Sequence, residues 1–193
     1  MKDSLKTDFT LDVDELRRRA RMHIENGAVT EDYQGNRETV IKLLNEALAT
    51  ELVCVLRYKH DHHMAVGIHA EPVSAEFAEH ALEEQGHADL LASRITQLGG
   101  EPDYNPEGLR TRAHSEYVVR TSLVDMIREN LVAERIAIDS YSRMIRFISD
   151  SDPTTRRMLE EILAKEEEHA EDLADLLATL DPTEKTAPPV SEA

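Results

Sequence analysis

Two short stretches decide the fold that this chain is expected to adopt. They read LEEQGHADLL at residues 82–91 and AKEEEHAEDLADLL at residues 164–177. Both have the apolar spacing of an amphipathic helix, and both contain the pattern Glu-x-x-His. The pattern lies at Glu84 and His87 in the first stretch and at Glu166 and His169 in the second. Residues three apart share a helix face, so each helix presents a carboxylate beside an imidazole.

A further glutamate precedes each Glu-x-x-His pair by nearly the same distance. Glu51 stands 33 residues before Glu84, and Glu134 stands 32 residues before Glu166. The chain thus contains two copies of one unit, in which a glutamate, a helix reversal and Glu-x-x-His follow one another.

The first glutamate of each copy falls on an apolar helix face. The apolar neighbours at helical spacing are Leu44, Leu48, Val55 and Tyr58 around Glu51, and Ile127, Leu131, Ile138 and Tyr141 around Glu134. Each tyrosine follows its glutamate by seven residues, about two helical turns. A carboxylate on a core face costs several kcal/mol unless it is protonated, paired or bound to a metal ion.

Four glutamates and two histidines that converge in one core need about two divalent cations to balance them. Carboxylate oxygens with one imidazole per metal suit iron or manganese better than structural zinc, which prefers Cys and His. A single Glu-x-x-His is a weak signal in an acidic helix, and His80 with Glu83 is such a chance pair in reversed order. Two copies at matched distances indicate a dinuclear metal site.

The helical period predicts four long helices, at about residues 37–66, 73–98, 117–149 and 153–180. Short breaks join the first to the second and the third to the fourth, so each pair should form an antiparallel hairpin. The second and third helices are joined by about 18 residues, which reach about 60 Å when extended, whereas a 25-residue helix is about 38 Å long. We therefore predict an all-α four-helix bundle with one long crossover.

Three segments are expected along the chain: a polar arm at residues 1–37, the bundle at 38–180 and a disordered tail at 181–193. In the arm, Thr10 or Asp12 should cap a short helix that runs to about Asn26 and lies solvated on the surface. The crossover is long enough for its own short helix, with EGLRTRAHSEY as the candidate.

Composition limits the classes of function. The net charge of −17 disfavours general nucleic-acid binding and suits a protein that attracts cations. Cys54 is the only cysteine, which excludes an intrachain disulfide and a Cys-based zinc or rubredoxin-type site. The N-terminus has no apolar signal-peptide core and no segment approaches transmembrane length, so we expect a cytoplasmic protein with no membrane partner.

Residues 38–180 resemble the ferritin-like di-iron carboxylate superfamily, and within it the bacterioferritins and the Dps-like proteins with a bacterioferritin-type site. The motifs that carry the resemblance are NEALATELVCVLRY, EEQGHADLL, NLVAERIAIDSY and EEEHAEDLADLL. The resemblance implies terminal metal ligands at Glu51 and Glu134, bridging ligands at Glu84 and Glu166, and one imidazole per metal from His87 and His169. It also implies an electron-donor role for Tyr58, with Tyr141 as its counterpart in the second half or as a core residue.

The resemblance implies ferroxidase chemistry. Two iron ions per chain, for which manganese or zinc could substitute, would be oxidised as Fe(II) by O2 or H2O2 and stored as Fe(III) mineral in a hollow homo-oligomeric shell. The fifth helix of 24-subunit ferritins has no counterpart here, which favours 12 subunits over 24. Gln85-Gly86 stands where bacterioferritins place a haem-ligating Met, so no haem is expected. The oxidant and the balance between storage and peroxide removal stay open.

Three other functions compete with this interpretation. A di-iron or di-manganese oxidase, peroxidase or oxygenase that does not store iron would use the same six ligands. A nucleoid protein would contact DNA through the arm's RRRAR at residues 17–21, and a salt-dependent gel shift would reveal it. A metal-free structural bundle is disfavoured by the cost of six buried polar groups.

Several further polar residues lie near the predicted site in sequence. Glu79 and Glu83 either conduct iron or belong to a solvated surface. In KHDHHMA at residues 59–65, His62 alone returns to the face of Glu51 and is a candidate entry residue. The remaining members, His60, Asp61 and His63, are expected to be polar residues at a helix end, where histidine suits the C-terminal dipole.

Overall fold

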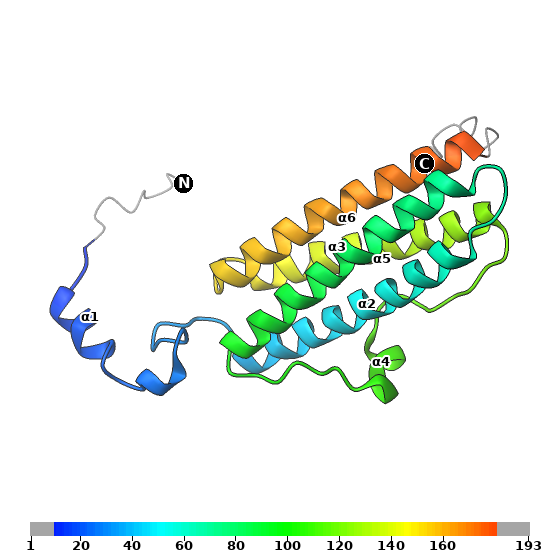
Figure 1. Ribbon diagram of the computed structural model, residues 1–193. Coiled ribbons are helices and arrows are strands. Elements are labelled where there is room, and N and C mark those ends of the chain that lie inside the picture. Colours follow the sequence, from blue (N-terminus) through cyan, green and yellow to red (C-terminus); the bar gives the residue numbers. More distant parts are fainter. Residues whose placement is uncertain (1–9, 181–193) are drawn as a thin grey trace, which may run out of the picture.

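The computed structural model describes residues 10–180, which contain helices and loops and no strand (Figure 1). The helices are α1 (Val13–Arg19), the short 3-10 helix η1 (Ile24–Asn26), α2 (Arg37–Met64), α3 (Ala70–Gln97), α4 (Pro106–Arg112), α5 (Leu123–Ile148) and α6 (Pro153–Leu180). The long helices α2, α3, α5 and α6 lie side by side as a bundle, which confirms the predicted fold class. The tail predicted at residues 181–193 lies outside the described residues.

The two predicted hairpins are present. The most extensive helix contacts are between α2 and α3 and between α5 and α6. The crossover from α3 to α5 then runs back along α2, because its backbone forms hydrogen bonds with successive α2 side chains. Asn45 Oδ1 accepts from Asp103 N at 2.7 Å, Thr50 Oγ1 accepts from His114 N at 2.9 Å, and Arg57 donates to the carbonyl of Glu116 at 2.9 Å.

Local capping chemistry sets the helix ends. Ser122 Oγ accepts from Asp125 N at 3.1 Å and begins α5 there, so the prediction that this helix starts near Tyr117 is wrong. Helix α3 begins at Ala70, three residues before the predicted start. Pro72 therefore lies inside the first turn, where a missing N–H costs no helical hydrogen bond. The short helix predicted in the crossover is present as α4, although it ends at Arg112 whereas the candidate stretch runs to Tyr117.

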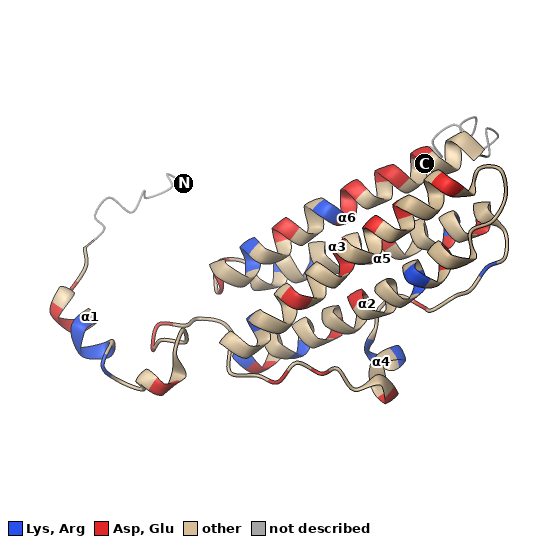
Figure 2. Ribbon diagram, viewed as in Figure 1, with Lys and Arg blue, Asp and Glu red and all other residues tan. Residues whose placement is uncertain are grey.

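The N-terminal arm is less helical than predicted. Asp12 caps α1, since its Oδ1 accepts from Glu15 N at 2.9 Å, but α1 ends at Arg19 rather than near Asn26. His23 has φ of 50°, a left-handed conformation that an α-helix cannot continue. Helix α1 buries no residue and stands apart from the bundle (Figure 1). Basic residues gather on it (Figure 2), and its arginines form ion pairs with acidic residues such as Glu15.

The bundle core has two apolar parts. One contains Leu48 and Ala88, and the other contains Cys54 and Ala81. Glu51 lies on α2 between the residues of the two parts, and Glu84 lies between them on α3. The same holds for α5 and α6, so the fold places a polar layer between two apolar ones.

Buried polar clusters tie the two hairpins together at both ends. Arg94 at the end of α3 donates to both Asp152 oxygens at 2.8 and 3.0 Å, and Asp152 caps α6 through Thr155 N at 2.9 Å. At the opposite end, Arg57 Nε of α2 donates to Asn130 Oδ1 of α5 at 2.8 Å. These contacts fix the register in which the two halves meet.

Every helix among residues 10–180 is too short or too polar to cross a membrane.

Candidate metal centre

The structure brings all six predicted ligands together in the polar layer. Helices α2 and α5 contribute one glutamate each, and α3 and α6 each contribute a Glu-x-x-His pair from a single face. Five of the six side chains are at most 1% exposed, while His87 is 7% exposed. The set, which we call the hexad, is Glu51, Glu84, His87, Glu134, Glu166 and His169.

The hexad divides into two groups of four residues, in each of which the potential ligand atoms lie within 4.8 Å of one another. The first group is Glu51, Glu84, His87 and Glu166, and the second is Glu84, Glu134, Glu166 and His169. Both groups contain Glu84 and Glu166, and each has one imidazole. Two carboxylates common to two neighbouring sets are arranged as bridging ligands of two metal ions would be.

The imidazole nitrogens lie close to these carboxylates. His87 Nδ1 lies 2.8 Å from Glu166 Oε1 and 3.4 Å from Glu84 Oε2. His169 Nδ1 lies 3.5 Å from Glu84 Oε1, and its Nε2 lies 2.7 Å from Glu83 Oε2 on the other side of the ring. A carboxylate on the outer nitrogen fixes the tautomer and the orientation of a metal-binding histidine.

Many polar atoms of the hexad lack a hydrogen-bond partner among the described residues. They are both carboxylate oxygens of Glu84 and of Glu166, Glu134 Oε2, and the Nδ1 atoms of His87 and His169. A buried polar atom without a partner is costly, and native cores contain few of them. Divalent cations would satisfy these atoms together. A carboxylate-rich set with one imidazole per group fits iron or manganese better than structural zinc.

The protonation of the hexad shows the same need for positive charge. Burial and the Glu84 carboxylate raise the pKa of Glu51, and burial with the neighbouring carboxylates raises that of Glu166 well above its usual range. Burial alone would lower the pKa of the two imidazoles, but the surrounding carboxylates outweigh it and raise the pKa of His87 to about 10 and of His169 to about 9. Without metal, protons neutralise the site, and metal binding would displace them.

Each of the two tyrosines forms a hydrogen bond from its own hairpin to a glutamate of the other hairpin. The Tyr58 hydroxyl on α2 donates to Glu134 Oε1 on α5, and the Tyr141 hydroxyl on α5 donates to Glu51 Oε1 on α2. Burial and the carboxylates raise the pKa of both phenols well above 10, so both remain protonated donors. Tyr141 is therefore both a core residue and the structural counterpart of Tyr58.

Sequence reasoning missed the importance of His80. Its ring is 1% exposed, stacks on His169 with 4.1 Å between ring centroids, and places Nδ1 3.1 Å from the Tyr58 hydroxyl. Burial and the neighbouring His169 lower the pKa of His80 to about 3, so the ring is neutral. His80 precedes Glu84 by four residues, and this helical spacing was the signal that could have revealed it.

The other histidines of the sequence patterns lie elsewhere. His62 Nδ1 is within 2.7 Å of the Ser74 carbonyl and 2.9 Å of its hydroxyl, and so links the end of α2 to the start of α3. His60 Nδ1 lies 3.0 Å from Asp61, which accepts from Asn130. Of the two flanking glutamates, Glu83 contacts His169, whereas Glu79 is exposed.

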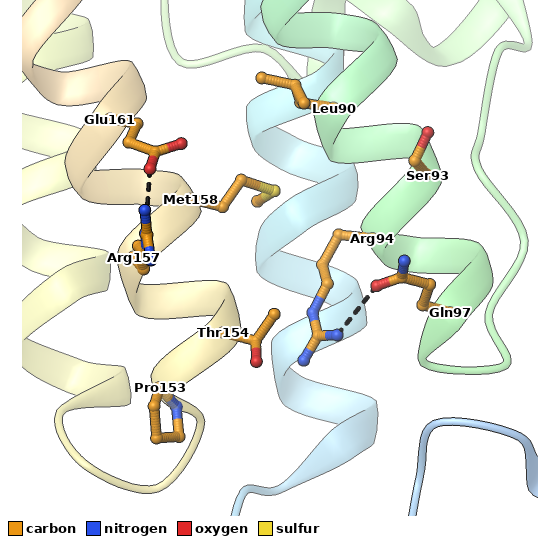
Figure 3. A pocket seen from close by; sticks show the side chains of 9 residues that line it. All are labelled: Leu90, Ser93, Arg94, Gln97, Pro153, Thr154, Arg157, Met158 and Glu161. Atoms are coloured by element: carbon orange, nitrogen blue, oxygen red, sulfur yellow. Dashed lines mark hydrogen bonds and ion pairs between the residues drawn. The ribbon is translucent and has the colours of Figure 1, made fainter.

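Two adjoining hollows follow the seam between α3 and α6. One, of about 400 Å³, is lined by Gly86, His87 and Lys165, and it reaches the most exposed member of the hexad. The other, of about 660 Å³, lies further along, where Arg94 and Gln97 of α3 face Thr154 and Met158 of α6 (Figure 3). None of the residues that line the larger hollow belongs to the hexad, so the larger volume does not identify the candidate metal site.

Comparison with known proteins agrees with this geometry. Residues 41–182 match the model of the ferritin-like domain, so the chain belongs to that family. A bacterioferritin from Desulfovibrio desulfuricans is 31% identical over 140 residues, which cover 70% of this chain and 74% of the relative. A solved bacterioferritin structure from the same species, whose diiron site was studied in different catalytic states, has a TM-score of 0.68 at 25% identity and covers 77% of this chain and 85% of its own.

Two further relatives extend the comparison. A dodecameric thioferritin, the bacterioferritin-related protein from Bacteroides fragilis, has a TM-score of 0.75 at 33% identity, over 79% of this chain and 92% of that chain. A DNA protection during starvation protein from Pyrococcus furiosus is 28% identical over 146 residues, which cover 72% of this chain and 77% of the relative. The expected kinship with bacterioferritins and Dps-like proteins is therefore confirmed.

Proposed function

We propose that this chain is a ferroxidase that binds two Fe(II) ions in the hexad, oxidises them with O2 or H2O2, and stores the Fe(III) as mineral inside a homo-oligomeric shell. The observation that carries the proposal is the pair of four-residue groups that have Glu84 and Glu166 in common. Relatives named bacterioferritin, one with a studied diiron site, support iron storage and ferroxidase activity as the general role.

Each side chain has a role in this proposal. Glu84 and Glu166 bridge the two irons, Glu51 and His87 complete one coordination sphere, and Glu134 and His169 complete the other. Each Fe(II) gives one electron, so the pair reduces O2 to H2O2 with two protons, or H2O2 to two waters with two protons. Where only one Fe(II) is bound, Tyr58 would supply the second electron that reduction of H2O2 to two waters requires, and its phenol proton would pass to Glu134.

The oligomeric state distinguishes an iron-storage protein from a di-iron enzyme that does not store iron. Exposed apolar side chains on the long helices are candidates for subunit contacts; they include Leu56, Leu82, Val132 and Phe147. Because one neighbour is described as dodecameric, a 12-subunit shell is our preferred state, with 24 subunits as the alternative. The acidic net charge and the paired arginines of α1 argue against DNA as the main partner.

An anaerobic Fe(II) titration of the metal-free protein tests the proposal. O2 and H2O2 are then added in separate runs, with the ferric-oxo absorbance and light scattering followed. We expect saturation at two irons per chain, fast oxidation, and a large shell that accepts many more irons. Two irons on a small oligomer that accumulates no more would instead identify a di-iron oxidase or peroxidase. No binding would leave a metal-free structural bundle.

A further inference from the structure

The hydrogen bonds of His80 define which of its nitrogens carries the proton. The single hydroxyl proton of Tyr58 is donated to Glu134, so the Tyr58 oxygen can only accept from His80 Nδ1, 3.1 Å away. With the Nδ1 hydrogen used in this contact, Nε2 on the opposite side of the ring is the His80 atom that can offer a lone pair to a cation.

Two carboxylates lie close to this nitrogen. His80 Nε2 lies 3.2 Å from Glu76 Oε1 on the same helix and 3.9 Å from Asp172 Oδ2 on α6. It has no hydrogen-bond partner among the described residues, although the ring is 1% exposed. A lone pair and two carboxylates that face one another repel, unless a cation lies between them. The potential ligand atoms of these three residues are all within 4.8 Å of one another.

A surface hollow borders the two carboxylates of this group. This hollow, of about 250 Å³, is lined by Glu76, Asp172 and Asp175, and the Asp172 side chain is 47% exposed. The third carboxylate, Asp175, adds negative charge at the mouth of the hollow. A cation could arrive through the hollow, and water could fill the coordination positions that protein atoms leave open.

We infer that Glu76, His80 and Asp172 form a mononuclear site for a divalent transition-metal ion, separate from the two positions in the hexad. Two carboxylates, one imidazole and open water positions suit Fe(II), Mn(II), Co(II) or Zn(II). Binding at this triad does not require that the hexad be filled. Binding at the triad would still affect the hexad, because a metal ion on Nε2 fixes the proton of His80 on Nδ1. That proton is donated to Tyr58, which in turn donates to Glu134 of the hexad.

The inference is tested with Co(II), which is not oxidised under these conditions. The chelator-treated full-length protein is titrated by calorimetry and visible absorption, in excess Mg(II) to suppress weak binding to surface carboxylates. We expect three tight equivalents per chain in the parent protein. Asp172→Asn, at an exposed position, and Glu76→Gln should each weaken one of them at least tenfold and leave two. Circular dichroism checks that both variants fold.

Matched variants make the result decisive. Glu79→Gln removes the same charge from an exposed position on α3 and should keep three equivalents. A Glu84→Ala, Glu166→Ala double variant should lose the hexad ions and keep one. The inference is overturned if the parent binds only two ions and Asp172→Asn changes neither, in which case a proton neutralises the triad. One equivalent in the parent that is lost in Asp172→Asn would support the triad and contradict the dinuclear proposal.

Discussion

The hairpin α2–α3 and the hairpin α5–α6 carry the same chemistry at the same spacing, but they differ just outside it. Each supplies a core glutamate, a tyrosine two turns later and a Glu-x-x-His pair, and each tyrosine donates to the glutamate of the other hairpin. The four matched pairs are Glu51 with Glu134, Tyr58 with Tyr141, Glu84 with Glu166, and His87 with His169. The hexad is therefore close to two-fold symmetric.

The first difference lies one turn before the bridging glutamates. His80 precedes Glu84 by four residues, whereas the matching residue before Glu166 is Ile162, a fully buried part of the apolar core. The surroundings of the two tyrosines therefore differ. Tyr58 contacts His80, which in turn lies near Glu76 and Asp172, whereas Tyr141 belongs to the same apolar cluster as Ile162. The positions that the two hairpins share form the candidate metal site, and the position that differs between them, His80 against Ile162, makes one side of that site polar.

The second difference lies immediately before the same glutamates, where α3 has Glu83 and α6 has Lys165. Glu83 contacts the outer nitrogen of His169, and Lys165 lies 3.2 Å from Glu83 rather than acting as a second carboxylate. His169 is therefore held by an outer carboxylate, while His87 borders a hollow. The two imidazoles have different surroundings despite matched positions in sequence.

The largest effect should come from the bridging positions, where the two halves are equivalent. Glu84→Ala or Glu166→Ala should abolish binding of both irons and slow oxidation at least ~100-fold, beyond the ~10–100-fold that loss of an outer partner costs. Glu51→Ala or Glu134→Ala should retain one iron, in the intact half. Anaerobic Fe(II) titration and stopped-flow absorbance measure both quantities, and Glu160→Ala, at an exposed site on α6, is the control. Parental oxidation by Glu84→Ala would refute the bridging assignment.

The contact that holds the hairpins in register should give the largest change in stability. Asp152→Ala leaves the Arg94 guanidinium buried without its carboxylate, and it also removes the cap of α6. Loss of one partner of a buried ion pair costs about 3–5 kcal/mol of unfolding free energy. Urea denaturation measures it, with Asp150→Ala as a surface control, since the Asp150 side chain is 93% exposed. Equal midpoints for the two variants would show that the pair does not hold the halves together.

The difference in outer partners should appear in metal affinity. Glu83→Gln keeps the size of the side chain but weakens the contact to His169, so affinity for the iron on His169 should fall about 10–100-fold. Lys165→Gln should change affinity far less, because Lys165 contacts Glu83 and not an imidazole. A two-site titration of each variant tests this. A gain in affinity in Lys165→Gln that matches the loss in Glu83→Gln would mean that charge, and not orientation, is the cause, because the two substitutions change the local charge in opposite directions.

The sequence was sufficient to predict which six residues form the hexad, because the repeated pattern can be seen in the sequence itself. Core-facing Glu51 and Glu134 stand out against apolar neighbours, and their matched distances to Glu84 and Glu166 require two similar hairpins. Capping residues also predicted the start of α6, since Asp152 and Pro153 form a strong helix-start signal.

The sequence could not reveal contacts that depend on how the hairpins pack. His80 and Glu83 looked like a chance pair, and only the approach of α6 to α3 brings His169 against both of them. The start of α5 was misplaced although Val118, Val119 and Thr121 are weak helix formers, so local propensity agrees with the observed start at Leu123. The crossover meets α2 just before this stretch, where Arg57 donates to the carbonyl of Glu116.

The pH dependence of the free energy of unfolding of the metal-free protein tests whether protons replace metal ions in both halves of the hexad. The pKa of His87 is raised to about 10 and that of His169 to about 9, above the unfolded value of 6.5. The stability that these groups contribute is complete below pH 6.5 and is lost as the pH rises towards 9–10. Unfolding free energy should fall by several kcal/mol between pH 6.5 and 9.5, since each unit by which a pKa is raised is worth about 1.4 kcal/mol and both imidazoles contribute.

Metal loading provides the control for that measurement. Metal ligation needs neutral imidazoles and ionised carboxylates, so the loaded protein should lose less stability over the same range. Thermal melts with and without chelator compare the two states. A metal-free protein that grows more stable above pH 6.5 would contradict the protonated hexad.

The smallest effect, and the finest test of the asymmetry, concerns the two tyrosines. Both donate to a carboxylate that can accept the phenol proton on oxidation, but only Tyr58 also lies beside an imidazole, His80. His80 Nδ1–H can still donate to the oxygen of a Tyr58 radical, which stabilises that radical. With one Fe(II) per chain, reduction of H2O2 to water takes one electron from iron and one from a tyrosine, so electron paramagnetic resonance after H2O2 addition should show a tyrosyl signal that Tyr58→Phe removes and Tyr141→Phe keeps. The reverse pattern would mean that the polar side of the hexad does not direct electron donation.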